Sequence, residues 1–184
     1  QAADFAELRY VICGAEKVQE ATREVWAKKF GVSLMEGYGA TETGPVLSTS
    51  SIIEHRDGAV GRLFPGVDYK LETIDGVVEG GKLLVKGPNI MKGYLNPGPN
   101  AEFQKLEGWY DTGDIVTVDE DRYIFIKGRA KRFAKISGEM VSLTAVEAAL
   151  AGAFPQHGED CAVAVVARPD ACLLYTSPSP RDSV

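Results

Sequence analysis

The first sixty residues alternate between short apolar runs and one stretch of helical periodicity. Residues 8–13 form an apolar run that ends at Gly14, which predicts a buried strand followed by a tight turn. In residues 18–30 apolar side chains recur at helical spacing, and Gly31 stands where a C-terminal helix glycine is expected. Residues 32–36 predict a second strand. Such a strand–helix–strand unit predicts a parallel sheet with ligands at the carboxyl ends of its strands.

Beyond Pro45 the pattern changes to short strands separated by glycine and proline turns. These strands are expected at residues 60–63, 67–73, 82–86 and 115–127. Regular short strands of this kind predict a small antiparallel barrel or sandwich. Thr144 and Glu147 then have the spacing of a capping box, which predicts the start of a helix, and residues 161–167 predict a strand. The fold class is therefore mixed α/β and β, ending in the start of a small α+β domain.

Composition excludes several classes of protein. The 184 residues are 45% hydrophobic and 25% charged, which is typical of a soluble globular protein. A net charge of −6 argues against binding to nucleic acid, and no apolar run approaches the roughly 20 residues that span a bilayer. Cys13, Cys161 and Cys172 lack paired or metal-ligand spacing. This spacing favours inert thiols in a reduced compartment, so a cytoplasmic location is expected.

Both ends of the chain depart from the pattern of a complete domain. The chain begins at Gln1, without a methionine, and enters strand-forming sequence at once, so we interpret it as an internal piece of a longer protein. The run C-L-L-Y-T-S-P-S-P-R-D from Cys172 to Asp182 resembles a translated transposase-type sequencing adaptor. A natural tail rich in proline and serine is the alternative. Residues 172–184 are left out of the fold prediction.

Residues 108–139 carry the side chains of a candidate nucleotide site. The stretch opens with Trp109, Tyr110, Thr112 and Asp114, continues as a hairpin, and ends in Arg129, Lys131, Arg132 and Lys135. A carboxylate can accept two hydrogen bonds from a sugar diol, and a guanidinium can grip ribose or phosphate with two donors. The tight connection between the strands brings both ends of the stretch to one edge. The alternatives are a solvated basic face and an aspartate that merely caps a turn.

A second candidate is the glycine-rich segment E-G-Y-G-A-T-E-T-G-P at residues 36–45. Glycines let the backbone approach a ligand closely. The face of Tyr38 can stack on a base, Thr41 can donate to a phosphate oxygen, and Glu42 is an oxygen ligand suited to magnesium. A plain glycine-rich loop is the alternative.

Four motifs in order resemble the core motifs of the adenylate-forming superfamily. They are Y-G-A-T-E at 38–42, G-K-L-L-V-K-G-P-N-I-M-K-G-Y at 81–94, Y-D-T-G-D at 110–114 and G-R-A-K-R-F-A-K-I-S-G-E at 128–139. That superfamily contains acyl-CoA synthetases, luciferases and peptide-synthetase adenylation domains. The wording G-R-A-K-R-F-A-K-I-S-G-E-M-V-S-L is also similar to the acyl-ACP synthetase domain of 2-acylglycerophosphoethanolamine acyltransferase/acyl-ACP synthetase proteins.

The resemblance implies a role for each matching position. The residues implied to bind the nucleotide are Gly14, Ala15, Glu16, Tyr38, Gly39, Thr41, Asp114 and Arg129, of which the first three line the adenine. Tyr38 packs on that base, Thr41 contacts the α-phosphate, and Glu42 takes part in catalysis by holding Mg²⁺. Asp114 binds the ribose hydroxyls, with Arg129 beside it.

The resemblance also implies a division into parts. Residues 1–59 end a large α/β subdomain, 60–130 form a β-barrel subdomain, and 131–171 hold the hinge and a truncated α+β domain. Lys131 is the implied hinge residue, and Lys135 is implied to enter the site during thioester formation. The phosphate loop with its lysine is expected before Gln1.

The implied parent enzyme is an AMP-forming fatty-acid ligase that uses ATP and Mg²⁺. Its partners are a fatty acid and a phosphopantetheine thiol, on acyl carrier protein in the first interpretation and on coenzyme A in the alternative. A non-catalytic nucleotide-binding or carrier-protein-binding module of the same fold is a further alternative. The fragment alone is expected to be inactive. The parent is expected in the cytoplasm, with attachment to the cytoplasmic face of the inner membrane left open.

Overall fold

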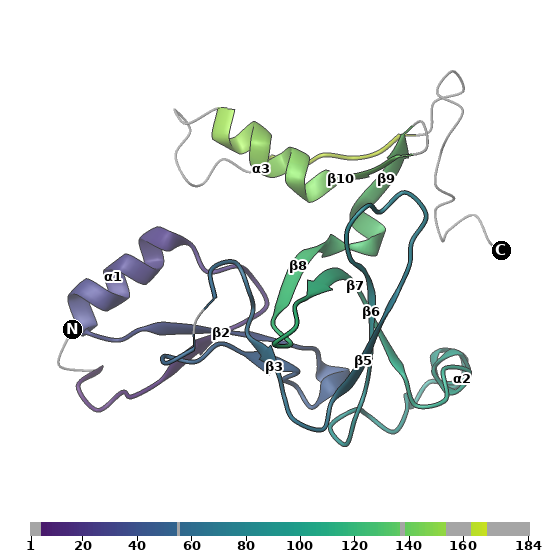
Figure 1. Cartoon of the computed structure of the whole chain (residues 1–184), viewed down its shortest axis with the longest axis horizontal. Coiled ribbons are helices and arrows are strands. Elements are labelled where there is room, and N and C mark those ends of the chain that lie inside the picture. The colour runs from purple at the N-terminus through teal and green to yellow at the C-terminus, as the bar shows by residue number, and fades with distance from the viewer. Residues whose placement is uncertain (1–4, 55, 137–138, 154–162, 169–184) are drawn as a thin grey trace.

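Three β-sheets organise the part of the chain that the computed structural model describes, which is residues 5–54, 56–136, 139–153 and 163–168 (Figure 1). The predictions for the tail at 172–184, for Cys161 and for Cys172 lie outside these residues. No helix among the described residues is long and apolar enough to cross a membrane.

The first sheet begins with the predicted strand–helix–strand unit. Strands β1 (Val11–Cys13) and β2 (Leu34–Tyr38) are parallel and are joined by helix α1 (Glu20–Phe30). The helix ends at Gly31, whose φ of 67° and whose amide bonds to the last turn fit the predicted C-terminal glycine. Both strands begin later than predicted, because their pairing starts only at Val11 and Leu34.

Two short antiparallel strands extend this sheet. After the 3₁₀ turn η2 (Thr41–Thr43), strand β3 (Ser48–Thr49) pairs with β2, and β4 (Arg62–Leu63) pairs with β3. The sheet order is therefore β1-β2-β3-β4.

The second sheet is antiparallel and has the order β5-β6-β7-β8. Its strands are β5 (Asp68–Glu72), β6 (Gly81–Lys86), β7 (Tyr110–Val118) and β8 (Ile124–Arg129). The predicted barrel does not close, since β5 has no strand partner beyond β6 among the described residues. Backbone hydrogen bonds do connect the two sheets, because the Ile124 amide donates to the Gly61 carbonyl at 3.0 Å and the Leu63 amide to the Arg122 carbonyl at 3.0 Å.

An apolar core with residues from both sheets holds the two sheets together. Its buried members are Leu47, Leu63, Val67, Leu83, Val85, Val116 and Ile124. They come from both sheets and from the segments between them, so the sheets share one apolar core.

Helix α2 (Pro97–Gln104) was not predicted, because its first residues, P-G-P-N, are typical of a turn. Proline is tolerated at the start of a helix, where its missing N–H has no intrahelical partner. The buried ring of Phe103 anchors the helix.

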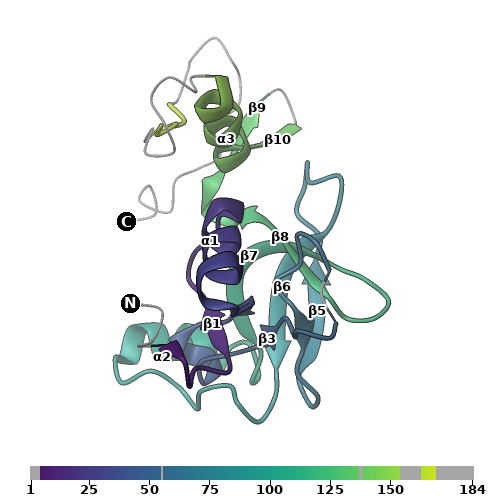
Figure 2. The same cartoon turned by 90° about the vertical axis from the view of Figure 1, so that its left-hand side faces the viewer.

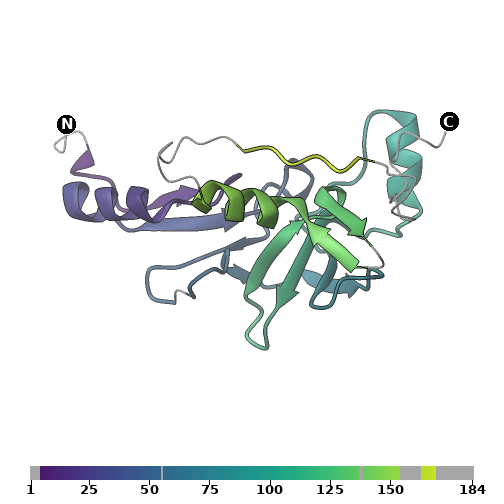
Figure 3. The same ribbon diagram turned by 90° about the horizontal axis from the view of Figure 1, so that it is seen from above.

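The last part consists of η3 (Ala130–Arg132), β9 (Phe133–Ile136), β10 (Glu139–Ser142) and α3 (Leu143–Ala153). Figures 1 and 2 show β9, β10 and α3 grouped together above the two larger sheets, and Figure 3 shows α3 from above.

The predicted capping box of α3 is wrong, because the helix begins one residue before Thr144. The hydroxyl of Ser142 accepts the Ala145 amide at 3.2 Å and so serves as the cap. Glu147 instead accepts hydrogen bonds from the Arg132 side chain and, at 2.7 Å, from the Val165 amide. The predicted strand at 161–167 is also wrong in its described part, since residues 163–168 carry no strand pairing.

Candidate functional site

The β7–β8 hairpin brings Asp114 and Arg129 together, although not the rest of the basic run that was predicted to join them. Asp114 and Arg129 are partners in the register of the two strands, and the Arg129 Nε lies 2.9 Å from the Asp114 Oδ1. The Tyr38 hydroxyl, from the end of β2, donates to the other carboxylate oxygen at 2.6 Å. The site therefore lies where the two larger sheets meet, with one side chain from the first and two from the second.

Burial sets the electrostatics of this cluster. It raises the pKa of Asp114, whereas the Tyr38 hydrogen bond and the Arg129 charge act in the opposite direction. Burial and then the negative charge of Asp114 also raise the pKa of Tyr38, so its hydroxyl remains a proton donor at neutral pH. An ionised carboxylate has about four lone-pair positions, so Asp114 keeps acceptor capacity beyond Tyr38 and Arg129.

Glu42 lies in the turn η2, directly after β2. Its Oε1 accepts a hydrogen bond from the Tyr94 hydroxyl at 3.1 Å. Burial and then the negative charge of Glu42 raise the pKa of Tyr110, whereas the positive charge of Arg129 acts in the opposite direction. Tyr110 therefore lies within electrostatic range of both Glu42 and Arg129. Thr41, beside Glu42, is exposed.

The described residues do not provide a complete set of protein ligands for Mg²⁺. They contain no group of three histidine, cysteine or carboxylate side chains that could hold a metal ion. Magnesium in phosphate-transfer sites is commonly held by one or two carboxylates together with substrate phosphates and water. The single carboxylate of Glu42 fits that mode of binding.

The predicted adenine-lining residues follow β1, next to the end of β2. A Cβ atom at Gly14 would lie 3.1 Å from the Gly37 carbonyl oxygen, which places this turn against β2. Ala15 has a φ of 71°, a conformation that is uncommon for a residue other than glycine and that recurs at functional sites. Gly14, Ala15 and Glu16 are exposed. At Gly39 a Cβ atom would lie 2.0 Å from the Pro45 carbonyl oxygen, so no side chain fits there.

The basic run at 129–135 does not act as one group. Arg129 joins Asp114, whereas Arg132 pairs with Glu147. Lys135 pairs with Asp75, in the connection between β5 and β6, and thus lies outside the Asp114 cluster. Lys131 is exposed on η3.

Comparison with known proteins identifies the family. The family profile described as "AMP-binding enzyme" matches residues 1–95. The chain belongs to the AMP-binding enzyme family. It is 35% identical over 153 residues to a long-chain-fatty-acid–CoA ligase of Yersinia pestis, an alignment that covers 80% of this chain and 27% of that protein.

Solved structures of AMP-forming ligases share the fold. O-succinylbenzoate coenzyme A synthetase of Bacillus subtilis, in complex with ATP and magnesium ion, gives a TM-score of 0.62 at 27% identity, covering 81% of this chain and 34% of that one. A malonyl-CoA ligase with methylmalonyl-CoA and AMP bound gives a TM-score of 0.57 at 31% identity, covering 92% and 37%. The chain spans only 27% of the length of the Yersinia pestis ligase that it matches in sequence. These relatives support the predicted superfamily. They are coenzyme A ligases and synthetases, so they do not support the narrower similarity to acyl-ACP synthetases.

Sequence reasoning gave no role to Tyr94 and Asn89, although both lie in the 81–94 motif of this AMP-binding family member. Their contacts to the Glu42 turn depend on tertiary structure, and no periodicity or spacing reveals them. The only sequence signal for a role of these two residues was their position in the 81–94 motif.

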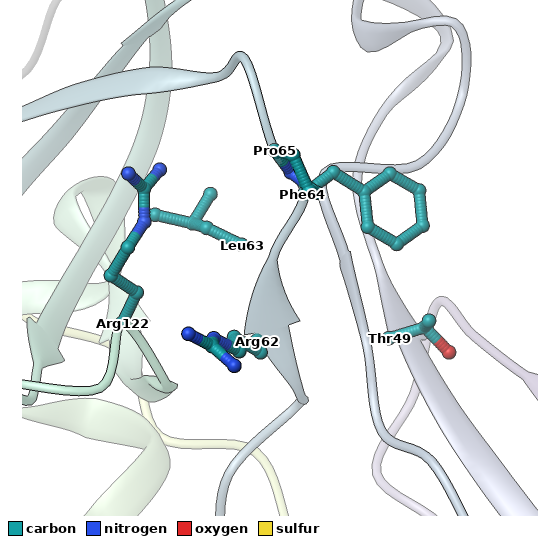
Figure 4. A pocket seen from close by; sticks show the side chains of 6 residues that line it. All are labelled: Thr49, Arg62, Leu63, Phe64, Pro65 and Arg122. Carbon is teal, nitrogen blue, oxygen red and sulfur yellow. The ribbon is translucent and has the colours of Figure 1, made fainter.

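A separate pocket of about 450 Å³ lies at β4 (Figure 4). It is lined by Thr49, Arg62, Leu63, Phe64, Pro65 and Arg122. The pocket shares no residue with the Asp114 cluster. Arg122 is held in place there, since it donates to the Val67 carbonyl and lies with its guanidinium 5.7 Å from the centre of the Tyr69 ring.

Proposed function

We propose that this chain is part of an ATP-dependent, AMP-forming ligase that activates a fatty carboxylate and transfers the acyl group to the thiol of coenzyme A. Family membership and the similarity to a long-chain-fatty-acid–CoA ligase support this proposal. The observation that carries it is the junction of the two sheets, where Asp114 accepts from Tyr38 and Arg129.

In this proposal Asp114 accepts the two ribose hydroxyls of ATP. Its buried position and its two protein donors hold the carboxylate in one orientation. Arg129, whose side chain is 68% exposed, keeps donors free for the ribose or a phosphate. The ring of Tyr38 packs on the adenine, beside the turn that starts at Gly14, and Gly39 lets the backbone pass close by.

The phosphates lie toward Thr41 and Glu42. Thr41 donates to the α-phosphate, and Glu42 holds Mg²⁺. When bound, the cation neutralises phosphate charge. A fatty carboxylate oxygen then attacks the α-phosphorus, the bond to the bridging oxygen breaks, and pyrophosphate leaves with its electron pair.

Lys135 acts in the second step. The thiol, as thiolate, attacks the acyl carbonyl carbon, a C–S bond forms, the bond from that carbon to the phosphate oxygen breaks, and AMP leaves with its electron pair. The ion pair with Asp75 keeps Lys135 away from Asp114 in the present arrangement. We propose that rotation about Lys131 carries Lys135 to the adenylate, where its positive charge stabilises the negative charge that develops in the transition state.

A carrier-protein thiol is the second candidate acceptor. The wording G-R-A-K-R-F-A-K-I-S-G-E-M-V-S-L at 128–143 favours it. Both acceptors present the same phosphopantetheine thiol, so the first half-reaction is the same for both.

The test uses the complete enzyme that contains this chain. Palmitate-dependent ATP–pyrophosphate exchange should be well above background, and thioester should then form with coenzyme A. Transfer to acyl carrier protein but not to coenzyme A would select the second candidate. An enzyme that binds ATP without any exchange, over a range of carboxylic acids, would refute the proposal and favour a non-catalytic module.

A further inference from the structure

The segment that follows β6 is fastened to the turn that carries Glu42. We call residues 87–94 the strap; they are the last part of the 81–94 motif, for which the proposed function has no role. The Met91 amide donates to the Glu42 carbonyl oxygen at 2.8 Å. The strap thus fixes the backbone of Glu42 itself.

Asn89 strengthens this attachment from the other side of the turn. Its Nδ2 donates to the Thr43 carbonyl at 2.8 Å and to the Val46 carbonyl at 3.2 Å. One side-chain amide thereby bridges both ends of the segment between Thr43 and Val46. Gly44, at a φ of 69°, allows the close approach, because a Cβ there would lie 2.8 Å from the Asn89 carbonyl oxygen.

Tyr94 then reaches the Glu42 side chain. Its ring meets the buried Phe103 ring edge to face, with centroids 6.2 Å apart and an interplanar angle of 83°. Its amide donates to the Asn100 Oδ1 at 3.0 Å. Ring and backbone are therefore held by α2, and the hydroxyl is left to donate to Glu42 at 3.1 Å.

We propose that Tyr94 is a positioning residue for Glu42, and that the strap couples α2 to the magnesium-binding carboxylate. The inference rests on the proposed function, in which Glu42 holds the cation. The Tyr94 hydroxyl donates to Oε1 and thereby restricts the rotamers of Glu42, which holds the carboxylate in place for the cation. Hydrogen-bonded outer partners of metal-binding carboxylates typically change metal affinity by about 10- to 100-fold.

The experiment measures ATP binding by the complete enzyme by calorimetry, as a function of Mg²⁺ concentration and without acyl substrate. Tyr94→Phe retains the ring on Phe103 and removes only the donor. We expect it to raise the Mg²⁺ concentration needed for half-maximal ATP binding by about tenfold or more. Tyr10→Phe is the matched control, since Tyr10 is 64% exposed and has no place in the strap; it should match the wild type.

A double-mutant cycle separates positioning from general structure. In a Glu42→Gln background, Tyr94→Phe should have no further effect on the Mg²⁺ dependence, since the carboxylate that Tyr94 positions for the cation is then absent. Unchanged Mg²⁺ dependence in Tyr94→Phe, or an equal effect in the presence and absence of the Glu42 carboxylate, overturns the inference. A wild-type enzyme that binds ATP with Mg²⁺ but forms no adenylate would refute the proposed function alone, because this readout needs no turnover.

Discussion

The substitution Asp114→Asn should separate the stability of the protein from nucleotide binding. Asp114 is 4% exposed, and burial raises its pKa above the ordinary value of 3.8. A buried carboxylate whose pKa is raised, at the junction of two sheets, is a candidate functional group. We therefore expect Asp114→Asn to leave the fold intact and to weaken ATP binding.

The change in stability follows from the contacts of Asp114. An asparagine Oδ1 can still accept from Tyr38, and the lost pair with Arg129 is worth about 0–1 kcal/mol because the arginine is 68% exposed. The unfolding free energy at pH 7 should therefore change by no more than about 1 kcal/mol. Asp114→Ala leaves the Tyr38 hydroxyl without its acceptor and should cost about 1–3 kcal/mol.

The pH dependence gives a second signature. The folded state binds the Asp114 proton more tightly than the unfolded state does, so wild-type stability falls as pH rises from the ordinary pKa of 3.8 through the raised value. At pH values above the raised pKa of Asp114, this contribution to stability is lost completely. Asp114→Asn lacks a titrating group there, so this fall should be absent from its unfolding curves.

Calorimetric titration with ATP measures the functional effect. Loss of charge-assisted bonds to the ribose diol should weaken binding by roughly 10- to 150-fold, since such bonds contribute about 1.5–3 kcal/mol. Asp114→Asn that bound ATP as tightly as the wild type would show that Asp114 does not hold the ribose. Destabilisation equal to that of Asp114→Ala would show that the charge itself supports the fold.

Three further predictions concern the other proposed residues. Lys135→Ala should slow thioester formation from preformed acyl-adenylate by roughly 10- to 1,000-fold and leave pyrophosphate release nearly unchanged, and equal loss in both half-reactions would count against the hinge. Asp75→Asn, which removes the partner of Lys135, should leave pyrophosphate release unchanged and speed transfer of the preformed adenylate in single-turnover assays; slower transfer would contradict a holding role for the ion pair. The 184-residue chain alone should give only background pyrophosphate exchange with palmitate, and robust exchange would refute this map of the site.

Local patterns predicted most of the fold, because they act within one element or between neighbours in the chain. Helical periodicity and Gly31 located α1, and period-two alternation located the β7–β8 hairpin. Helix α2 was missed because its propensity is poor and its burial depends on the Phe103 side chain. The cap of α3 was misplaced from Ser142 to Thr144, since two hydroxyl residues stand close together and sequence alone cannot rank them.

The candidate site was predictable only where its residues are joined by a hairpin. Asp114 and Arg129 are brought together by adjacent strands, so their pairing followed from the sequence. Tyr38 was expected to stack through its face, and its hydroxyl bond to Asp114, 76 residues away, was not foreseen. The same holds for Tyr94 and Glu42, which are 52 residues apart.

Asp114 and Glu42 thus each accept a hydrogen bond from a tyrosine hydroxyl. Tyr38 serves Asp114, and Tyr94 serves Glu42. Burial raises the pKa of both tyrosines, and the neighbouring carboxylates raise it further, so each hydroxyl keeps its proton and stays neutral. A neutral donor orients a carboxylate without cancelling its charge, whereas a buried lysine would do both. At Glu42 the negative charge therefore remains available to a cation, and at Asp114, which also pairs with Arg129, the tyrosine adds no second positive charge, so the carboxylate keeps acceptor capacity for a ribose diol.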